Sequence, residues 1–210
     1  MSIFVAFAVI ATLLTKWLQV AHLTFDAKDA VITIAAYVYG PASAVLMSIA
    51  TSVIESLTFG GDTGWYGFLM NVASSIVFAV PASYIYGKKR DINGALIGLL
   101  IATGLCTAVM LVLNIFVAPL YFGIPLFAPF IMNMIPVLIL PFNLAKAIMN
   151  SALAMYLYKP VTMALKSAGL IEGDPKKTLV FNQNSIKIII FGFVGLVISA
   201  VTFVILMLLN

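Results

Sequence analysis

Charged residues are scarce in this chain of 210 amino acids. Asp, Glu, Lys and Arg make up 9% of the sequence, apolar residues make up 63%, and the mean hydropathy is +1.17. Soluble domains carry about 25% charged and about 45–50% apolar residues. Because so few polar groups cannot cover a surface that faces water, the composition excludes a soluble globular domain.

Histidine and cysteine each occur once, and the common catalytic motifs are missing. His22 has no partners for a metal site, so we expect a polar loop residue. Cys106 lies in an apolar run, where it has no partner for a disulfide and is expected to pack. The sequence has no Gly-x-x-x-x-Gly-Lys-Ser/Thr, no His-Glu-x-x-His and no Gly-x-Ser-x-Gly. Nothing therefore supports an enzyme, a metal centre or an ATP-binding loop.

What the sequence does contain is a series of long apolar segments. Only helices and closed barrels satisfy their backbone hydrogen bonds in a bilayer. An unbroken apolar run such as 186–209 excludes a barrel, whose strands alternate over about ten residues. The net charge of +4 comes from basic residues at segment ends, which is typical of membrane topology and not of nucleic-acid binding. The chain is therefore predicted to be an all-α integral membrane protein.

The apolar segments predict six core spans and one more. A Gly40-Pro41 pair separates the second from the third, and the second is too short to cross about 30 Å of hydrocarbon squarely. The stretch 119–141 holds five prolines, so we expect an irregular cap or re-entrant segment there. The first segment lacks a basic region and a cleavage site and is expected to be retained. The six predicted spans are 2–21, 30–39, 42–59, 65–86, 92–118 and 142–165.

The sequence divides into three predicted parts. Residues 1–165 form the predicted six-helix domain, 166–184 a polar cytoplasmic connection, and 185–210 an additional C-terminal transmembrane helix. The basic clusters at 88–90 and 159–187 should both be cytoplasmic under the positive-inside rule, which requires two crossings between them. This parity agrees with a cap at 119–141, and it places the N-terminus inside. The connections 22–29, 60–64 and 119–141 then converge outside the plasma membrane, as in a receptor.

Asn143 and Lys146 are the strongest candidates for ligand contact. Their i, i+3 spacing puts both on one helix face at the outer start of the sixth span. An amide offers a paired donor and acceptor, and an ammonium donates to a carbonyl oxygen, which suits a planar heterocycle with imide-like edges. The alternative is that Asn143 caps the helix beside Pro141 and Lys146 extends to the interface.

Several other polar residues lie near the outer ends of the predicted spans. Polar groups at membrane depth are functional candidates by default. Asn114 contacts a ligand or makes an interhelical hydrogen bond. Glu55, the one carboxylate predicted within a span, binds a hydroxyl or pairs with Lys146. Asn71 lies one to two turns into the fourth span. Asp26 and Asp29 are expected to mark the start of the second helix.

Two other groups of residues suggest contacts with partners. Small residues in the first span, at the spacings Ala8/Thr12 and Ala11/Thr15, allow close helix approach, either to an external helix or within the chain. Aromatic residues near the outer ends could stack on an aromatic ligand or anchor the interface; they are Trp65, Tyr66, Tyr121 and Phe122.

Four stretches of this sequence resemble one family. They are LTFDAKDAVITIAAYVYGPASAVLMS (23–48), TGWYGFLMNVASSIVFAVPA (63–82), LNIFVAPLYFGIP (113–125) and PFNLAKAIMN (141–150). In this order they resemble the substrate-binding S components of energy-coupling-factor vitamin transporters, and the last is similar to the Pro-Phe-Asn-Leu-x-Lys motif of the riboflavin branch. The resemblance covers about residues 1–165.

The resemblance implies a six-helix subunit that captures riboflavin from outside and then docks on a transmembrane T component driven by two ATPases. In that family asparagines and a lysine hold the isoalloxazine ring, which corresponds here to Asn114, Asn143 and Lys146. The docking motif of the family is only approximated by Ala8/Thr12, and the chain begins almost inside its first helix, as a truncated start would. The alternatives are an S component for another vitamin (thiamine, pantothenate or a biotin-like molecule), a stand-alone carrier, or a small membrane enzyme.

Overall fold

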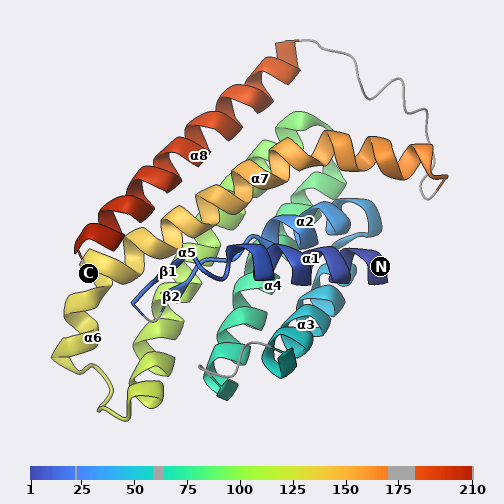
Figure 1. Ribbon diagram of the computed structural model, residues 1–210. Helices are drawn as coiled ribbons and strands as arrows, with labels where there is room; N and C mark the ends of the chain where they lie inside the picture. The colour runs from blue at the N-terminus through green and yellow to red at the C-terminus, as the bar shows by residue number, and fades with distance from the viewer. Residues whose placement is uncertain (22, 59–63, 170–182, 210) are drawn as a thin grey trace.

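A computed structural model describes residues 1–21, 23–58, 64–169 and 183–209 (Figure 1). Helices dominate, and in these ranges the β-structure is limited to one antiparallel hairpin. The elements are α1 (Ser2–Thr15), β1 (Gln19–Val20), β2 (Leu23–Thr24), α2 (Lys28–Tyr39), α3 (Pro41–Thr58), α4 (Gly64–Lys88), α5 (Ile92–Phe122), α6 (Pro129–Met134), the π-helix η1 (Ile135–Ile139), α7 (Leu140–Ser167) and α8 (Gln183–Leu209).

The first helix is shorter than the predicted span 2–21, because α1 ends at Thr15. Two tertiary contacts account for the difference. The Thr15 hydroxyl accepts the backbone N–H of Ala27 at 3.2 Å, and the N–H of Phe25 donates to the carbonyl of Leu18 at 2.8 Å. The chain therefore turns back as the β1–β2 hairpin, and the expected polar connection is a paired structure.

The break between the second and third helices is confirmed. α2 ends at Tyr39 and is followed by Gly40, whose φ of 90° is a conformation that residues with a side chain rarely adopt; α3 starts at Pro41. Eight of the twelve residues of α2 are buried, so this short helix lies inside the bundle and is covered by its neighbours.

α4 and α5 form an antiparallel pair near the predicted spans 65–86 and 92–118. The Asp91 side chain caps α5 by accepting the N–H of Gly94 at 2.6 Å. Gly98 lets the two helices approach closely, because a Cβ added there would lie 2.7 Å from the carbonyl oxygen of Ala82. Small residues at such contacts are typical of helices packed in a membrane.

The irregular cap predicted for 119–141 is largely wrong, because only 123–128 is non-helical. α5 continues through Pro119 to Phe122 and ends at Gly123 in the left-handed conformation. Pro129 lies in the first turn of α6, where its missing N–H needs no partner. Pro136 lies at the start of η1, whose wider turn tolerates the lost hydrogen bond and the proline ring.

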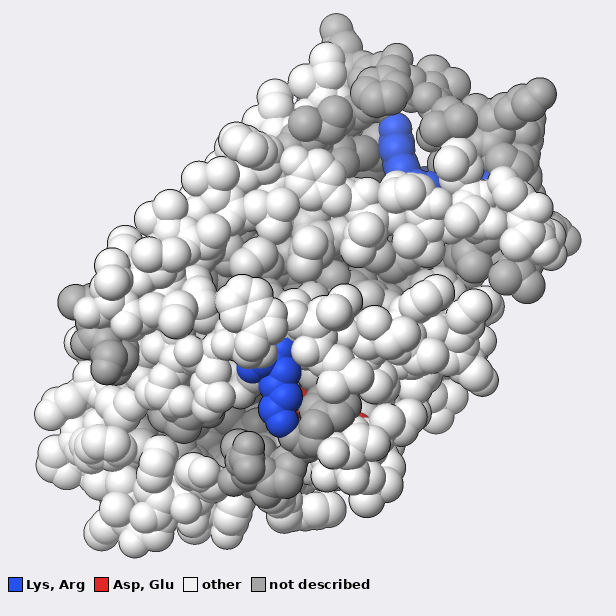
Figure 2. All heavy atoms as spheres, viewed as in Figure 1, with Lys and Arg blue, Asp and Glu red and all other residues white. Residues whose placement is uncertain are grey.

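The bundle is apolar on the surface visible in Figure 2. The blue side chains that are plainly visible there lie near the hairpin and towards the C-terminal end of α7. Within the described ranges, five helical segments are long and apolar enough to cross a membrane, and the α6–η1–α7 run counts as one of them. α1 is a shorter apolar helix of 14 residues. α8 lies along α7, and its C-terminal end reaches β1 (Figure 1).

Candidate functional site

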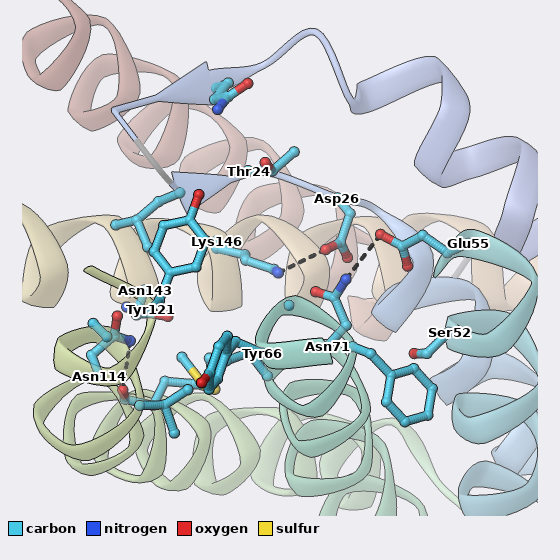
Figure 3. A pocket seen from close by; sticks show the side chains of 18 of the residues that line it. Thr24, Asp26, Ser52, Glu55, Tyr66, Asn71, Asn114, Tyr121, Asn143 and Lys146 are labelled. Carbon is cyan, nitrogen blue, oxygen red and sulfur yellow. Dashed lines mark hydrogen bonds and ion pairs between the residues drawn. The ribbon is translucent and has the colours of Figure 1, made fainter. Parts of the chain in front are cut away.

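A cleft opens between the hairpin and four helix ends (Figure 3). With its open mouth included, the space between these side chains is about 1190 Å³. The lining comes from five parts of the chain: Lys16, Gln19, Leu23, Thr24 and Asp26; Ser52, Glu55 and Ser56 of α3; Tyr66, Gly67, Phe68, Met70 and Asn71 of α4; Met110, Asn114, Val117, Ala118 and Tyr121 of α5; Phe142, Asn143 and Lys146 of α7.

A buried ion pair joins α7 to the hairpin segment, which is residues 18–27 and contains β1 and β2. Lys146 Nζ lies 2.8 Å from Asp26 Oδ2, and both residues are buried. Burial disfavours charge on the Asp26 carboxyl, but Lys146 and then Lys28 outweigh it and hold its pKa below the usual value. The second carboxylate oxygen, Oδ1, has no hydrogen-bond partner among the described residues. Asp26 is therefore a charged residue of the cleft lining, and one of its carboxylate oxygens is buried and unpaired among the described residues.

A second ion pair lies on the α3 side. Lys28 Nζ is 2.5 Å from Glu55 Oε2 and 3.9 Å from Asp26 Oδ2, and the Asn71 amide donates to Glu55 Oε1 at 2.9 Å. The predicted alternative that Glu55 pairs with Lys146 is therefore wrong. The reason is that α2 places Lys28 next to α3, while Lys146 reaches the hairpin segment.

The two asparagines that the sequence singled out both line the cleft. The amide nitrogen of Asn114 donates to the carbonyl of Met110, and that of Asn143 to the carbonyl of Ile139, each at 2.8 Å. Both bonds go to the residue four positions earlier in the chain. They are therefore neither the interhelical bond predicted as the alternative for Asn114 nor the helix cap predicted as the alternative for Asn143. An amide has two donor hydrogens and an acceptor oxygen, so each side chain keeps capacity for a partner in the cavity.

The aromatic candidates divide into two groups. Tyr66 and Tyr121 line the cleft with their rings edge to face, 6.4 Å apart. The other two lie outside the lining. Trp65 is 67% exposed and stacks on Phe68, and Phe122 packs edge-on against Tyr121.

The small residues of α1 lie on two faces. Ala8 and Thr12 are buried inside the chain, so the predicted alternative of intramolecular packing describes them. Ala11 and Thr15 are half-buried, and the Thr15 hydroxyl donates to the carbonyl of Ala11 at 2.8 Å. The outward surface of α1 is apolar, with Ile3, Phe7, Ile10 and Leu14 exposed.

Sequence reasoning gave no site role to two buried residues. Asp26 was assigned to the start of a helix, although a carboxylate in so weakly charged a chain is itself a signal. Asn150 was overlooked, although it lies on the Asn143/Lys146 face four residues after Lys146. It accepts the N–H of Ala30 at 3.0 Å and donates to the carbonyl of Asp26 at 3.0 Å, and it thereby fixes the segment that carries Asp26.

Asp29 is buried apart from the cleft. Its carboxylate accepts hydrogen bonds from Ser75 at 2.5 Å and Ser74 at 3.3 Å. Within the described ranges, no three His, Cys, Asp or Glu side chains are arranged to hold a metal ion. His22 lies outside the described residues.

These features match a known family. A family model described as "ECF transporter, substrate-specific component" matches residues 1–158, and the chain therefore belongs to that family. It is a multi-pass membrane protein of a transport system, which agrees with its apolar helices.

Individual relatives agree with this placement. The chain is 30% identical over 149 residues to "Riboflavin transporter RibU" of Staphylococcus aureus (strain TCH60), covering 69% of this chain and 78% of the relative. It is 26% identical over 102 residues to "Riboflavin transporter FmnP" of Bacillus subtilis (strain 168), covering 48% and 54%. A solved structure, "Structure and mechanism of the S component of a bacterial ECF transporter", superposes with a TM-score of 0.66 at 27% identity, covering 79% of this chain and 94% of that one.

Proposed function

We propose that this subunit captures riboflavin from outside the cell for ATP-driven uptake through an ECF transporter. The observation that carries the proposal is the polar wall of the cleft, where Asn114, Asn143, Lys146 and Asp26 border one cavity that also holds two tyrosine rings. The relatives named as riboflavin transporters support the same ligand.

The polar edge of the flavin ring matches this wall. Riboflavin is an uncharged planar heterocycle whose imide edge presents two carbonyl oxygens and one N–H. In our proposal Lys146 and the amides of Asn114 and Asn143 donate to the carbonyl oxygens, and the Asp26 oxygen without a partner accepts the N–H. Buried polar atoms in native proteins are almost always hydrogen-bonded, so an orphan carboxylate oxygen at a cavity favours a ligand that donates to it.

The hydroxyl tail of riboflavin has a matching surface on the α3 side. Ser52, Glu55 and Asn71 line that part of the cleft, and the buried Ser52 hydroxyl has no partner among the described residues. A polyhydroxyl chain could satisfy all three. Tyr66 and Tyr121 would contact the ring; Trp65, which is outside the lining, would contribute only if its region closed over the ligand.

The two ion pairs at the cleft favour an uncharged ligand. Lys146 pairs with Asp26, and Glu55 pairs with Lys28. A cationic vitamin such as thiamine or an anionic one such as pantothenate would disturb one of these pairs. We therefore propose riboflavin as the ligand in preference to these vitamins. A stand-alone carrier is the least favoured alternative, because the family works with a partner module.

The proposed arrangement in the membrane follows the sequence prediction. In this proposal α1, α2, α3, α4, α5 and α7 form a six-helix core in residues 1–165, and α8 is an additional crossing. The polar connection 166–184, most of which lies outside the described residues, is cytoplasmic. The N-terminus is cytoplasmic and the cleft faces outward. The partners are a T component and two ATPase subunits, and α1 is the proposed docking helix, through Ala11, Thr15 and its outward apolar surface.

Absorbance and fluorescence spectra of the purified protein, followed by riboflavin titration of ligand-free material, test the assignment. Co-purified flavin or quenching at nanomolar riboflavin is the expected result. Loss of a ligand hydrogen bond should weaken binding about 10- to 100-fold in Asn143→Ala and Lys146→Ala, whereas Trp65→Ala should change it less than about threefold. Absence of binding at micromolar riboflavin would overturn the ligand, and a panel of other vitamins would follow.

A further inference from the structure

Helix α8 lies outside residues 1–158, which carry the family match, yet it packs closely on the core. Two glycines make the approach to α7 possible. A Cβ added at Gly192 would lie 2.5 Å from the Tyr156 ring, and one added at Gly195 would lie 3.2 Å from Cβ of Ala152. Such close contact between helices is typical of a specific interface.

Further along, α8 contacts the segment of α7 that carries the ligand-binding candidates. The Ser199 hydroxyl is buried and donates to the backbone carbonyl of Ala145. Ala145 lies between Asn143 and Lys146 in the sequence. Ser199 therefore bonds the backbone of the same helical turn that presents both candidates to the cleft.

The C-terminal part of α8 also contacts the hairpin segment, residues 18–27. Phe203 is 9% exposed, and its ring packs edge to face on Phe25 with centroids 6.5 Å apart. Phe203 and Leu206 belong to one apolar cluster with Val20, Phe25, Leu138 and Phe142. Phe25 precedes Asp26, and Phe142 lines the cleft beside Asn143. One helix thus supports both partners of the Asp26–Lys146 ion pair from behind.

We infer that α8 is a positioning element of the binding site, in which Ser199 and Phe203 hold α7 and the hairpin segment together and so set how long the ligand stays bound. The inference rests on the proposed riboflavin site. Neither residue lines the cleft. Loosening the hairpin segment should speed ligand release and leave association almost unchanged, because the donors on α4 and α5 stay in place.

The test is stopped-flow measurement of riboflavin association and release by the full chain in detergent or nanodiscs. Phe203→Ala is compared with Phe193→Ala, a phenylalanine on the same helix that is 62% exposed. Ser199→Ala is compared with Thr202→Ala, whose hydroxyl bonds only within α8 at an exposed position, and with Ser199→Thr as a conservative rescue. Release should accelerate about three- to tenfold in Phe203→Ala, as expected for loss of one aromatic pair, with the controls within about twofold.

A second measurement does not depend on the ligand. Amide hydrogen exchange of residues 18–27 in the ligand-free protein should quicken in Phe203→Ala and stay unchanged in Phe193→Ala, while α4 and α5 keep their protection. Equal release rates in Phe203→Ala and Phe193→Ala, or faster exchange over the whole chain, would overturn the inference. If the unaltered protein fails to bind riboflavin but exchange still rises locally, the proposed ligand fails and the positioning role of α8 stands.

Discussion

Replacing Asp26 with asparagine should destabilise the protein by removing the counterion of Lys146. The two groups lie 2.8 Å apart and are buried. At an effective dielectric constant of about 20, their attraction amounts to roughly 6 kcal/mol, and removing one partner of a buried pair typically costs about 3–5 kcal/mol. Lys28 keeps Glu55 at 2.5 Å, so the unpaired charge in Asp26→Asn is that of Lys146.

A double-mutant cycle separates the ion pair from other effects of each change. Asp26→Asn and Lys146→Met are each expected to lower the free energy of unfolding, measured by SDS titration in mild detergent with tryptophan fluorescence. The double variant should be more stable than the sum of the two losses predicts, by about 2 kcal/mol or more, because neither charge is then left unpaired. It should nevertheless bind riboflavin as weakly as Lys146→Met.

Additive losses would refute the reasoning, because they would mean that the two side chains contribute independently despite their short separation. Stronger binding in Asp26→Asn would refute it in another way. That result would mean that Asp26 withholds Lys146 from the ligand and does not accept the ligand's N–H.

Three further predictions follow from contacts in the structure. Gly98→Ala should destabilise the chain by about 1–3 kcal/mol through overpacking of α4 and α5, whereas Gly104→Ala, which meets nothing within 4 Å, should be neutral or slightly stabilising in the same unfolding assay. Glu55→Gln should cost less stability than Asp26→Asn, because Lys28 retains a second carboxylate at 3.9 Å; an equal loss would contradict this. Because the pKa of Asp26 is held below 3.8, its pairing stabilises the fold above that value and is lost as pH falls through the lowered pKa. The stability gap to Asp26→Asn should therefore stay constant from about pH 8 to 5 and shrink below about pH 4.

Composition, together with the glycine, proline and capping residues between apolar segments, is enough to predict the class of fold and most helix bounds. Gly40-Pro41 and Asp91 act locally, through backbone conformation and capping, so their effects are readable from neighbouring residues. Pro119 and Pro136 misled the prediction because a proline terminates a helix only where its missing bond and its ring cannot be accommodated. Pro136 is accommodated at the start of the π-helix, and Pro119 lies inside α5 only one turn before its end; neither outcome is visible in the local sequence.

The site residues could likewise be predicted from the sequence, whereas their partners could not. Five residues could be singled out because polar groups at membrane depth are rare, and all five line the cleft: Asn114, Asn143, Lys146, Glu55 and Asn71. Tyr121, singled out as an aromatic residue, lines it as well. Their partners could not be assigned, since pairing depends on which helices become neighbours. Lys146 meets Asp26 across 120 positions of sequence, and Lys28 meets Glu55 across 27.

That long separation bears on the order in which the chain is assembled. As the protein is synthesised, Lys28 can find Glu55 as soon as α3 has formed, but Asp26 must wait for α7, and the N–H of Ala30 must wait for Asn150. Until then Asp26, two residues before α2, lacks its closest counterion next to an apolar bundle. The hairpin segment and the first turn of α2 therefore reach their final positions late, after most of the chain has left the ribosome. We therefore expect the completion of the cleft to be one of the last steps of folding.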